Sequence, residues 1–120
     1  MTDVESIVQR QLDAYNARDI DAFMAHWADD AQIFAFPSTI LADGAAEIRA
    51  RHVARFEEPD LYATLVSRMS LGNAVVDREI VTRNFPDGQG RVNVIAIYHV
   101  EDGRIAKAWF QMGDPVLEAS

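Results

Sequence analysis

The chain has 120 residues, a length typical of one domain, and we expect a single domain over residues 1–120. Its formal net charge of −8 argues against a nucleic-acid partner, because phosphate binding needs a positive surface. The absence of cysteine excludes disulfides, thiol nucleophiles and thiolate metal sites. No apolar run approaches the roughly 20 residues that span a bilayer, and there is no basic leader, so we expect a cytoplasmic protein without membrane contacts.

The N-terminal part of the chain predicts two helices. Thr2 followed by Glu5 is a capping box, and apolar side chains then recur at helical spacing as far as Tyr15. Asp19 can cap a second, shorter helix, which we expect Asp29-Asp30 to end. The apolar face of this second helix consists of Ile20, Phe23, Met24 and Trp27.

A short strand and a third helix follow. Residues 31–36 are typical of a strand that Pro37 stops, and residues 38–43 read as a loop. The segment 37–43 could act as a lid. Asp43-Gly44 then opens the third helix, and Glu58-Pro59 closes it. Its apolar stripe consists of Ala45, Ile48, His52 and Phe56.

The rest of the chain predicts strands joined by short turns. We expect them over residues 61–71, 74–85, 92–100 and 105–112. Strands with such short connections form an antiparallel meander. Helices that precede a run of strands favour an α+β fold over a parallel α/β sheet.

Four short motifs, in this order and spacing, resemble the NTF2-like superfamily, and most closely its SnoaL-like and steroid Δ-isomerase-like branch. The motifs lie at residues 15–19, 27–31, 43–49 and 102–105, and the resemblance covers about residues 3 to 113. It implies a cystatin-like cone, in which three N-terminal helices pack on a curved antiparallel sheet around a deep apolar pocket. It also implies a homodimer through the outer sheet face. Because the superfamily includes both enzymes and non-enzymatic modules, it does not fix the activity.

Ketosteroid isomerase, a member of this superfamily, uses an Asp base and an oxyanion hole of Tyr plus protonated Asp. The resemblance places the family's oxyanion Tyr on Gln11, its oxyanion Asp on Tyr98 and its second pocket Tyr on His52. The Asp base falls on Ala35, and residues 32–37 contain no acid. We therefore do not expect classical ketosteroid isomerisation.

The replacing residues are polar, and each lies on an otherwise apolar stripe or strand. Gln11 either faces the pocket or points into a water-filled corner. His52 is either a base near neutral pH or a core histidine that bonds a carbonyl. Tyr98 either binds the ligand through its hydroxyl or only packs, and Tyr15 has the same two alternatives.

Alternation along the last strand separates a pocket side from an outer side. Phe110 and Met112 belong to the pocket side, as does Trp27 of the second helix, so we expect all three to contact the ligand. The outer side carries His99 of the neighbouring strand and an exposed Trp109, which indicate a dimer contact. Lys107 and Gln111 share that outer side.

The charged residues predict neither a metal site nor a cofactor. Three histidines lie in three separate elements, and there is no Gly-rich phosphate loop. Asp77 and Glu79 are expected to form solvated cross-strand pairs. The arginines of the third helix, Arg51 and Arg55 among them, are expected on a solvated face, with Arg49 pinning the helix to the sheet.

Two functional hypotheses follow. In the first, the protein binds a small, mostly apolar molecule and acts as an isomerase, lyase or cyclase by proton transfer, with His52 and Tyr98 as catalytic residues. In the second, it is a non-catalytic dimeric module that senses a ligand or serves assembly. The missing Asp base favours the second, and the polar residues on core stripes favour the first, because an unsatisfied buried polar group is costly.

Overall fold

A computed structural model describes residues 3–118 as three helices on one curved sheet. Thr2 of the predicted capping box lies outside the described residues. The helices are α1 (Asp3–Ala17), α2 (Ile20–Met24) and α3 (Ala45–Arg55). The strands are β1 (Trp27–Ala35), β2 (Thr39–Asp43), β3 (Tyr62–Leu71), β4 (Ala74–Phe85), β5 (Gly88–Glu101), β6 (Arg104–Met112) and β7 (Val116–Leu117).

Local capping interactions define where two of the helices start. The side chain of Asp19 accepts a hydrogen bond from the backbone N–H of Ala22, as expected for the N-cap of α2. Gly44 precedes α3 with a φ of 94°, a conformation that side chains with a Cβ rarely adopt. The carboxylate of Glu47 then accepts from the backbone N–H of Asp43 and closes the first turn.

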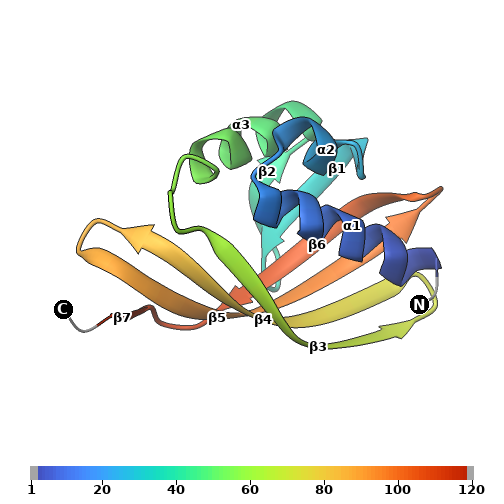
Figure 1. The fold of residues 1–120 in the computed structure, drawn as a ribbon. Helices are drawn as coiled ribbons and strands as arrows, with labels where there is room; N and C mark the ends of the chain where they lie inside the picture. The colour runs from blue at the N-terminus through green and yellow to red at the C-terminus, as the bar shows by residue number, and fades with distance from the viewer. Residues whose placement is uncertain (1–2, 119–120) are drawn as a thin grey trace.

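The strands form one sheet in the order β2-β1-β6-β5-β4-β3, with β7 paired to β5. The predicted antiparallel meander is confirmed, since β3, β4, β5 and β6 pair antiparallel in sequence. β1 joins the far side of β6 in a parallel orientation. Figure 1 shows all three helices on one face of the curved sheet, so the fold is the expected α+β cone.

Two predictions for the segment from α2 to β2 are wrong, one about the loop at residues 38–43 and one about the end of α2. The segment expected as a loop contains β2, which pairs with β1 through Ile33↔Ala42. Trp27 and Asp29-Asp30 belong to β1 instead of ending α2. α2 stops at Met24 because Trp27 pairs with Ile105 of β6, a contact across the chain that helical periodicity cannot reveal.

The face toward the helices holds the core. Along β4 every second side chain, from Val75 to Val81, is buried, and β5 repeats the pattern from Val92 to Val100. Val8 of α1 and Ile48 of α3 are fully buried against this face. Polar side chains at inward positions are therefore enclosed between the sheet and the helices.

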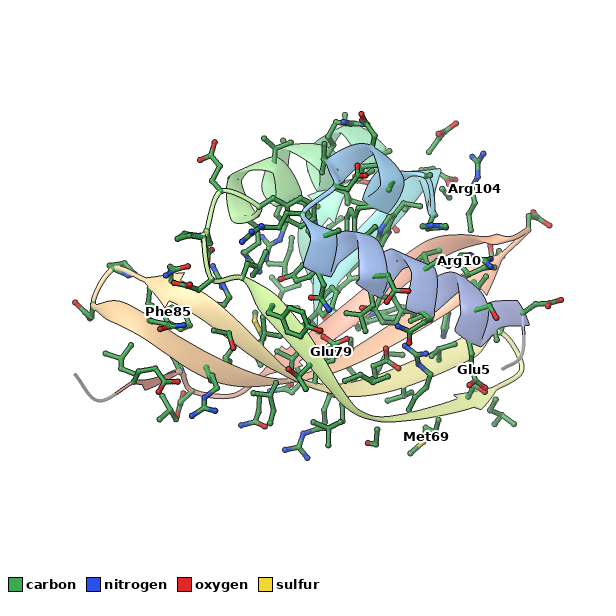
Figure 2. The ribbon with its side chains drawn as sticks, viewed as in Figure 1. Glu5, Arg10, Met69, Glu79, Phe85 and Arg104 are labelled. Atoms are coloured by element: carbon green, nitrogen blue, oxygen red, sulfur yellow. The ribbon has the colours of Figure 1, made fainter. Side chains whose placement is uncertain are left out.

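The opposite face carries an apolar row that crosses six strands. Each member pairs in register with the next on the neighbouring strand. The row consists of Ile40, Phe34, Trp109, Ile97, Val76 and Met69, and it is called the outer row below. Phe34 and Trp109 stack with ring centroids 5.6 Å apart, so Trp109 is half-buried instead of fully exposed. Met69 points away from α1, as seen in Figure 2.

Among residues 3–118, none of the helices combines the length and the apolar composition that crossing a bilayer requires.

Candidate functional site

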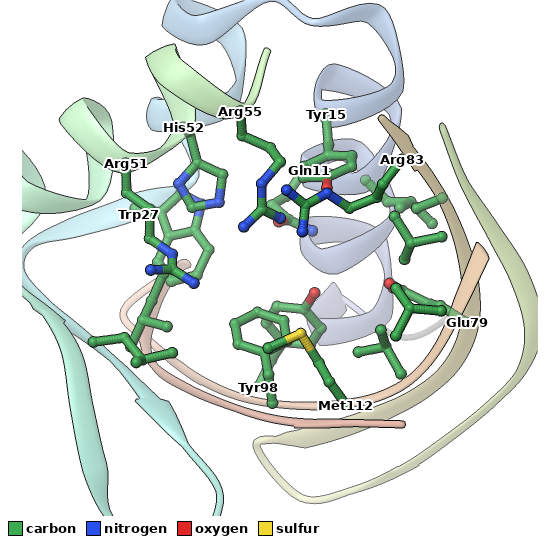
Figure 3. Close-up of a pocket in the computed structure, with 18 residues that line it drawn as sticks. Gln11, Tyr15, Trp27, Arg51, His52, Arg55, Glu79, Arg83, Tyr98 and Met112 are labelled. Carbon is green, nitrogen blue, oxygen red and sulfur yellow. The ribbon is translucent and has the colours of Figure 1, made fainter. Parts of the chain in front are cut away.

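A pocket opens between the helices and the concave face of the sheet. The space between its lining side chains is about 710 Å³ when the open solvent at its mouth is included. Figure 3 shows Trp27 and His52 on one side, Glu79 on the other, and Tyr98 and Met112 on the sheet. The lining residues are Gln11, Leu12, Tyr15, Trp27, Ile33, Leu41, Arg51, His52, Arg55, Ala63, Glu79, Val81, Arg83, Val92, Val94, Tyr98, Phe110 and Met112.

Two buried polar atoms in this pocket have no hydrogen-bond partner. They are Trp27 Nε1 and Glu79 Oε2, and they are the two such side-chain atoms within the described residues. Buried polar groups are nearly always satisfied, because an unpaired one costs about 1–3 kcal/mol. Both atoms belong to residues that line the pocket.

Glu79 is the strongest candidate for a base. Its side chain is 5% exposed, and it faces the pocket from β4. Burial, followed by the negative charge of Asp77, raises the pKa of Glu79 to about 7, while Arg68 opposes the shift. A carboxyl group with this pKa exchanges protons readily near neutral pH.

Asp77 is buried too, but it is fully paired. Arg68 Nε donates to Asp77 Oδ1 at 2.7 Å and Arg68 Nη2 to Oδ2 at 2.9 Å, with the aspartate 0% exposed. The expectation that Asp77 and Glu79 form solvated pairs is therefore wrong. Both take inward positions on β4, because they alternate with the outward residues in the same row as the buried Val75 and Val81.

Tyr98 supplies a neutral hydroxyl on the sheet side of the pocket. It is 3% exposed, and burial, together with the charges of Glu79 and Asp77, raises the pKa of Tyr98 well above its usual value. A hydrogen bond from the Gln11 side chain lowers it in part. The Tyr98 hydroxyl is therefore a candidate donor to a ligand oxygen.

His52 is held as a neutral ring. Its Nδ1 lies 2.8 Å from the carbonyl oxygen of Ile48, and since a carbonyl only accepts, Nδ1 carries the proton. Burial lowers the pKa of His52 to about 4, aided by the positive charges of Arg55 and Arg51. The centroids of the His52 and Phe23 rings lie 4.5 Å apart. His52 therefore presents an unprotonated Nε2 at neutral pH, which suits an acceptor better than a proton carrier.

Three arginines line the pocket, where the sequence predicted a solvated face for the two on α3. Arg51 and Arg55 lie one helical turn apart, and Arg83 reaches in from β4. Arg83 Nη2 donates to Glu58 Oε2 at 2.7 Å, and Arg55 Nε lies 3.7 Å from the same oxygen. These arginines make one side of the pocket positive.

The third arginine of α3 is at the surface. Arg49, expected to pin the helix to the sheet, pairs with Asp21 of α2 at 2.9 Å, and both side chains are exposed. Their contact joins two helices, so the prediction for Arg49 is wrong.

Most predicted site residues come together in this pocket. Gln11, Tyr15, Trp27, His52, Tyr98, Phe110 and Met112 all line it. Ala35 does not, although it pairs with Phe110 in register. Ile33, two residues earlier on the same strand face, lines the pocket in its place.

Sequence reasoning missed Glu79, Arg83, and the pocket position of Arg51 and Arg55. Val75, Asp77, Glu79 and Val81 alternate along β4, and the two valines could have placed Glu79 on the inward face of the strand. Val76 and Ile80, however, support the opposite assignment of the two faces equally well. Within residues 3–118 no group of three or more acidic or histidine side chains is arranged to hold a metal ion.

Comparison with known proteins identifies the family. The sequence profile of the SnoaL-like domain matches residues 8–108, so the chain belongs to the SnoaL-like family. No curated protein is similar enough in sequence to match.

Several solved structures share the fold. An uncharacterised cystatin-fold protein from Novosphingobium aromaticivorans is 26% identical, with a TM-score of 0.83 over 92% of this chain and 97% of that one. A proposed polyketide cyclase from Sinorhizobium meliloti is 24% identical, with a TM-score of 0.75 over 92% of this chain and 100% of that one. AclR, a proposed hydroxylase from Streptomyces galilaeus, is 17% identical, with a TM-score of 0.78 over 92% and 78% of the two chains. The NTF2-like, cystatin-like fold expected from the sequence is thereby confirmed.

Proposed function

We propose that the protein catalyses proton transfer on a small, mostly apolar carbonyl compound, as an isomerase, lyase or cyclase does. The observation that carries the proposal is the unpartnered carboxylate oxygen of Glu79 in an enclosed pocket, opposite the unpartnered N–H of Trp27. Glu79 takes the place of the absent Asp base, on a different strand from the one where the family resemblance implied it.

The first step is removal of a proton from the carbon next to the carbonyl. The ionised Glu79 accepts this proton, the C–H electron pair becomes a carbon–carbon double bond, and the carbonyl π pair moves onto oxygen. The enolate oxygen then accepts hydrogen bonds from the Tyr98 hydroxyl and from Trp27 Nε1–H. Protonated Glu79 returns the proton to another carbon, which completes an isomerisation without a net change in atoms, whereas return to the same carbon restores the substrate.

His52 remains a proposed catalytic residue in a changed role. Because its Nδ1 proton is bound to the Ile48 carbonyl, the ring has one lone pair, at Nε2, to offer to the ligand. We assign it to accept a hydrogen bond from a ligand hydroxyl, or from the enol form of the intermediate. The apolar walls formed by Phe110, Val92 and Met112 fit an apolar ligand body.

Deuterium exchange tests this function directly. In D₂O, the protein is expected to accelerate incorporation of deuterium next to the carbonyl of 2-tetralone, an apolar bicyclic ketone, as followed by NMR. Glu79→Gln should lower the enzymatic rate by about 10²–10⁴-fold, the usual contribution of a general base. Glu57→Gln, the same change at an exposed residue outside the pocket, should leave the rate unchanged. Equal rates for wild type and Glu79→Gln would overturn the role of Glu79.

The outer row favours a second function, in which a homodimer forms through the sheet face. Large apolar side chains that cross six strands in register make a continuous surface on the side that the helices leave open. A second copy of the chain would place two such rows face to face. Such a dimer is compatible with catalysis. It is equally compatible with the alternative function, a non-catalytic ligand-binding or assembly module.

A further inference from the structure

The pocket differs in charge from the chain that contains it. The protein has 19 acidic and 11 basic residues, yet the pocket lining contains Arg51, Arg55 and Arg83 against one acid, Glu79. Figure 3 shows the guanidinium groups of Arg55 and Arg83 close to Tyr15, and that of Arg51 beside Trp27. Cations gathered in a partly desolvated cavity of an acidic protein favour an anion there.

Protein carboxylates do not balance these arginines. Glu58 bonds Arg83 through both carboxylate oxygens, at 3.2 Å and 2.7 Å, and lies 3.7 Å from Arg55. Within residues 3–118, Arg51 has no hydrogen bond or ion pair. One carboxylate thus serves two guanidinium groups, and the third has none.

The unbalanced charge has a cost that a ligand can remove. Burial lowers the pKa of Arg51, and the nearby charges of Arg55 and Arg83 lower it further. Elsewhere the chain pairs its buried arginine, since Arg68 contacts both oxygens of Asp77. An anion that neutralises these half-buried like charges therefore stabilises the fold.

We propose that the ligand is an organic carboxylate, whose carboxylate group binds Arg51 and Arg55 while its apolar body lies against Phe110. The planar fork of a free guanidinium matches a carboxylate through two parallel N–H···O bonds. The guanidinium of Arg55 lies close to Tyr15, beside the cavity (Figure 3). This inference rests on the proposed function, because it takes the Glu79 end of the pocket as the reacting end.

The binding test uses two probes of one shape, 2-naphthoate and the neutral 2-naphthamide, in isothermal titration calorimetry. The carboxylate is expected to bind at least about tenfold more tightly than the amide, because hydrogen bonds between two charged groups are stronger than those to a neutral amide. Arg51→Gln should reduce this difference, and Arg51→Lys should reduce it less. Arg49→Gln, on the exposed face of the same helix, should bind as wild type does. Inorganic phosphate is the third ligand.

Each outcome decides the proposal. Equal binding of naphthoate and naphthamide, or undiminished naphthoate binding by a folded Arg51→Gln protein, would overturn it. Phosphate that binds as tightly as naphthoate would also overturn it, by showing a general anion site. Deuterium exchange of 2-tetralone separates this proposal from the proposed function. If the protein accelerates exchange but does not prefer naphthoate over naphthamide, only the carboxylate-ligand proposal is refuted. Carboxylate binding without exchange refutes proton transfer and leaves the anion site standing.

Discussion

Asp77 and Glu79 lie two residues apart on the inward face of β4, and Asp77 binds the Arg68 guanidinium through both oxygens while Glu79 Oε2 has no partner. Burial and, after it, the negative charge of Asp77 raise the pKa of Glu79. Two neighbouring acids thereby acquire different roles, one structural and one available for chemistry.

The first prediction concerns the pH dependence of stability at Glu79. Because the folded pKa of about 7 exceeds the ordinary value of 4.5, the folded state holds this proton more tightly, and stability falls as pH rises between these values. Glu79→Gln removes the penalty. We expect the variant to gain about 3 kcal/mol relative to wild type between pH 4.5 and pH 8, measured by urea unfolding. A difference that does not vary with pH would contradict the raised pKa.

The second prediction has the opposite sign. Since the folded pKa of His52 is about 4, below the ordinary 6.5, the unfolded chain binds the proton more tightly. Stability supplied by neutral His52 is complete above pH 6.5 and is lost as pH falls toward 4. The difference in the free energy of unfolding between wild type and His52→Gln should therefore shrink by about 3 kcal/mol as the pH falls from 6.5 to 4. An unchanged gap in urea titrations would show that the ring is not desolvated.

The third prediction tests the buried ion pair. Asp77→Asn removes the carboxylate charge to which Arg68 Nε and Nη2 donate, and the Arg68 side chain is only 9% exposed. We expect a loss of about 3–5 kcal/mol in the free energy of unfolding. The control is Glu118→Gln, which breaks the exposed pair with Arg91 and should cost less than about 1 kcal/mol. Equal losses in the two variants would show that burial does not strengthen the ion pair between Arg68 and Asp77.

The fourth prediction separates donors from packing in the pocket. Tyr98→Phe removes one hydroxyl and keeps the ring that packs 6.1 Å from Phe110. The exchange rate of 2-tetralone should fall by about 10²-fold, as expected for loss of one oxyanion donor. Circular dichroism and the thermal midpoint should show an intact fold. A variant with the full exchange rate would assign Tyr98 to packing alone.

The fifth prediction concerns the outer row. Trp109→Glu places a charge beside Phe34 at the middle of the proposed dimer interface. Light scattering should give a dimer for wild type and the 13.4 kDa monomer for the variant. Arg104→Glu, at the exposed β5–β6 turn, should remain dimeric. Identical masses for wild type and Trp109→Glu would reject this face as the interface.

The fold was predictable because its signals are local. Apolar spacing defined α1 and α3, and short turns defined the meander of four strands. β2 was missed because its pairing partner, β1, is what makes residues 39–43 a strand. Trp27 was assigned to a helix because its spacing from Phe23 fits a helical turn as well as it fits a strand start.

The candidate site was predictable only where polar residues interrupt an unambiguous apolar stripe. Gln11, His52 and Tyr98 met that condition, and all three line the pocket. Glu79 did not, because β4 has valine or isoleucine on both faces and its inward phase depends on register with β5. Arg51 and Arg55 looked like ordinary surface residues, since an arginine in a cavity and one in water have the same local sequence.

The parallel pairing of β1 with β6 joins residues 27–35 to residues 105–110. On the ribosome, β1 is synthesised long before its partner, so its second edge stays open until nearly the whole domain has emerged. The wall of the pocket that carries Trp27 can then close only as a late event in synthesis. A nascent chain stalled before β6 should accordingly be accessible to chaperones at β1, and a C-terminal truncation should remove binding before it removes helix content.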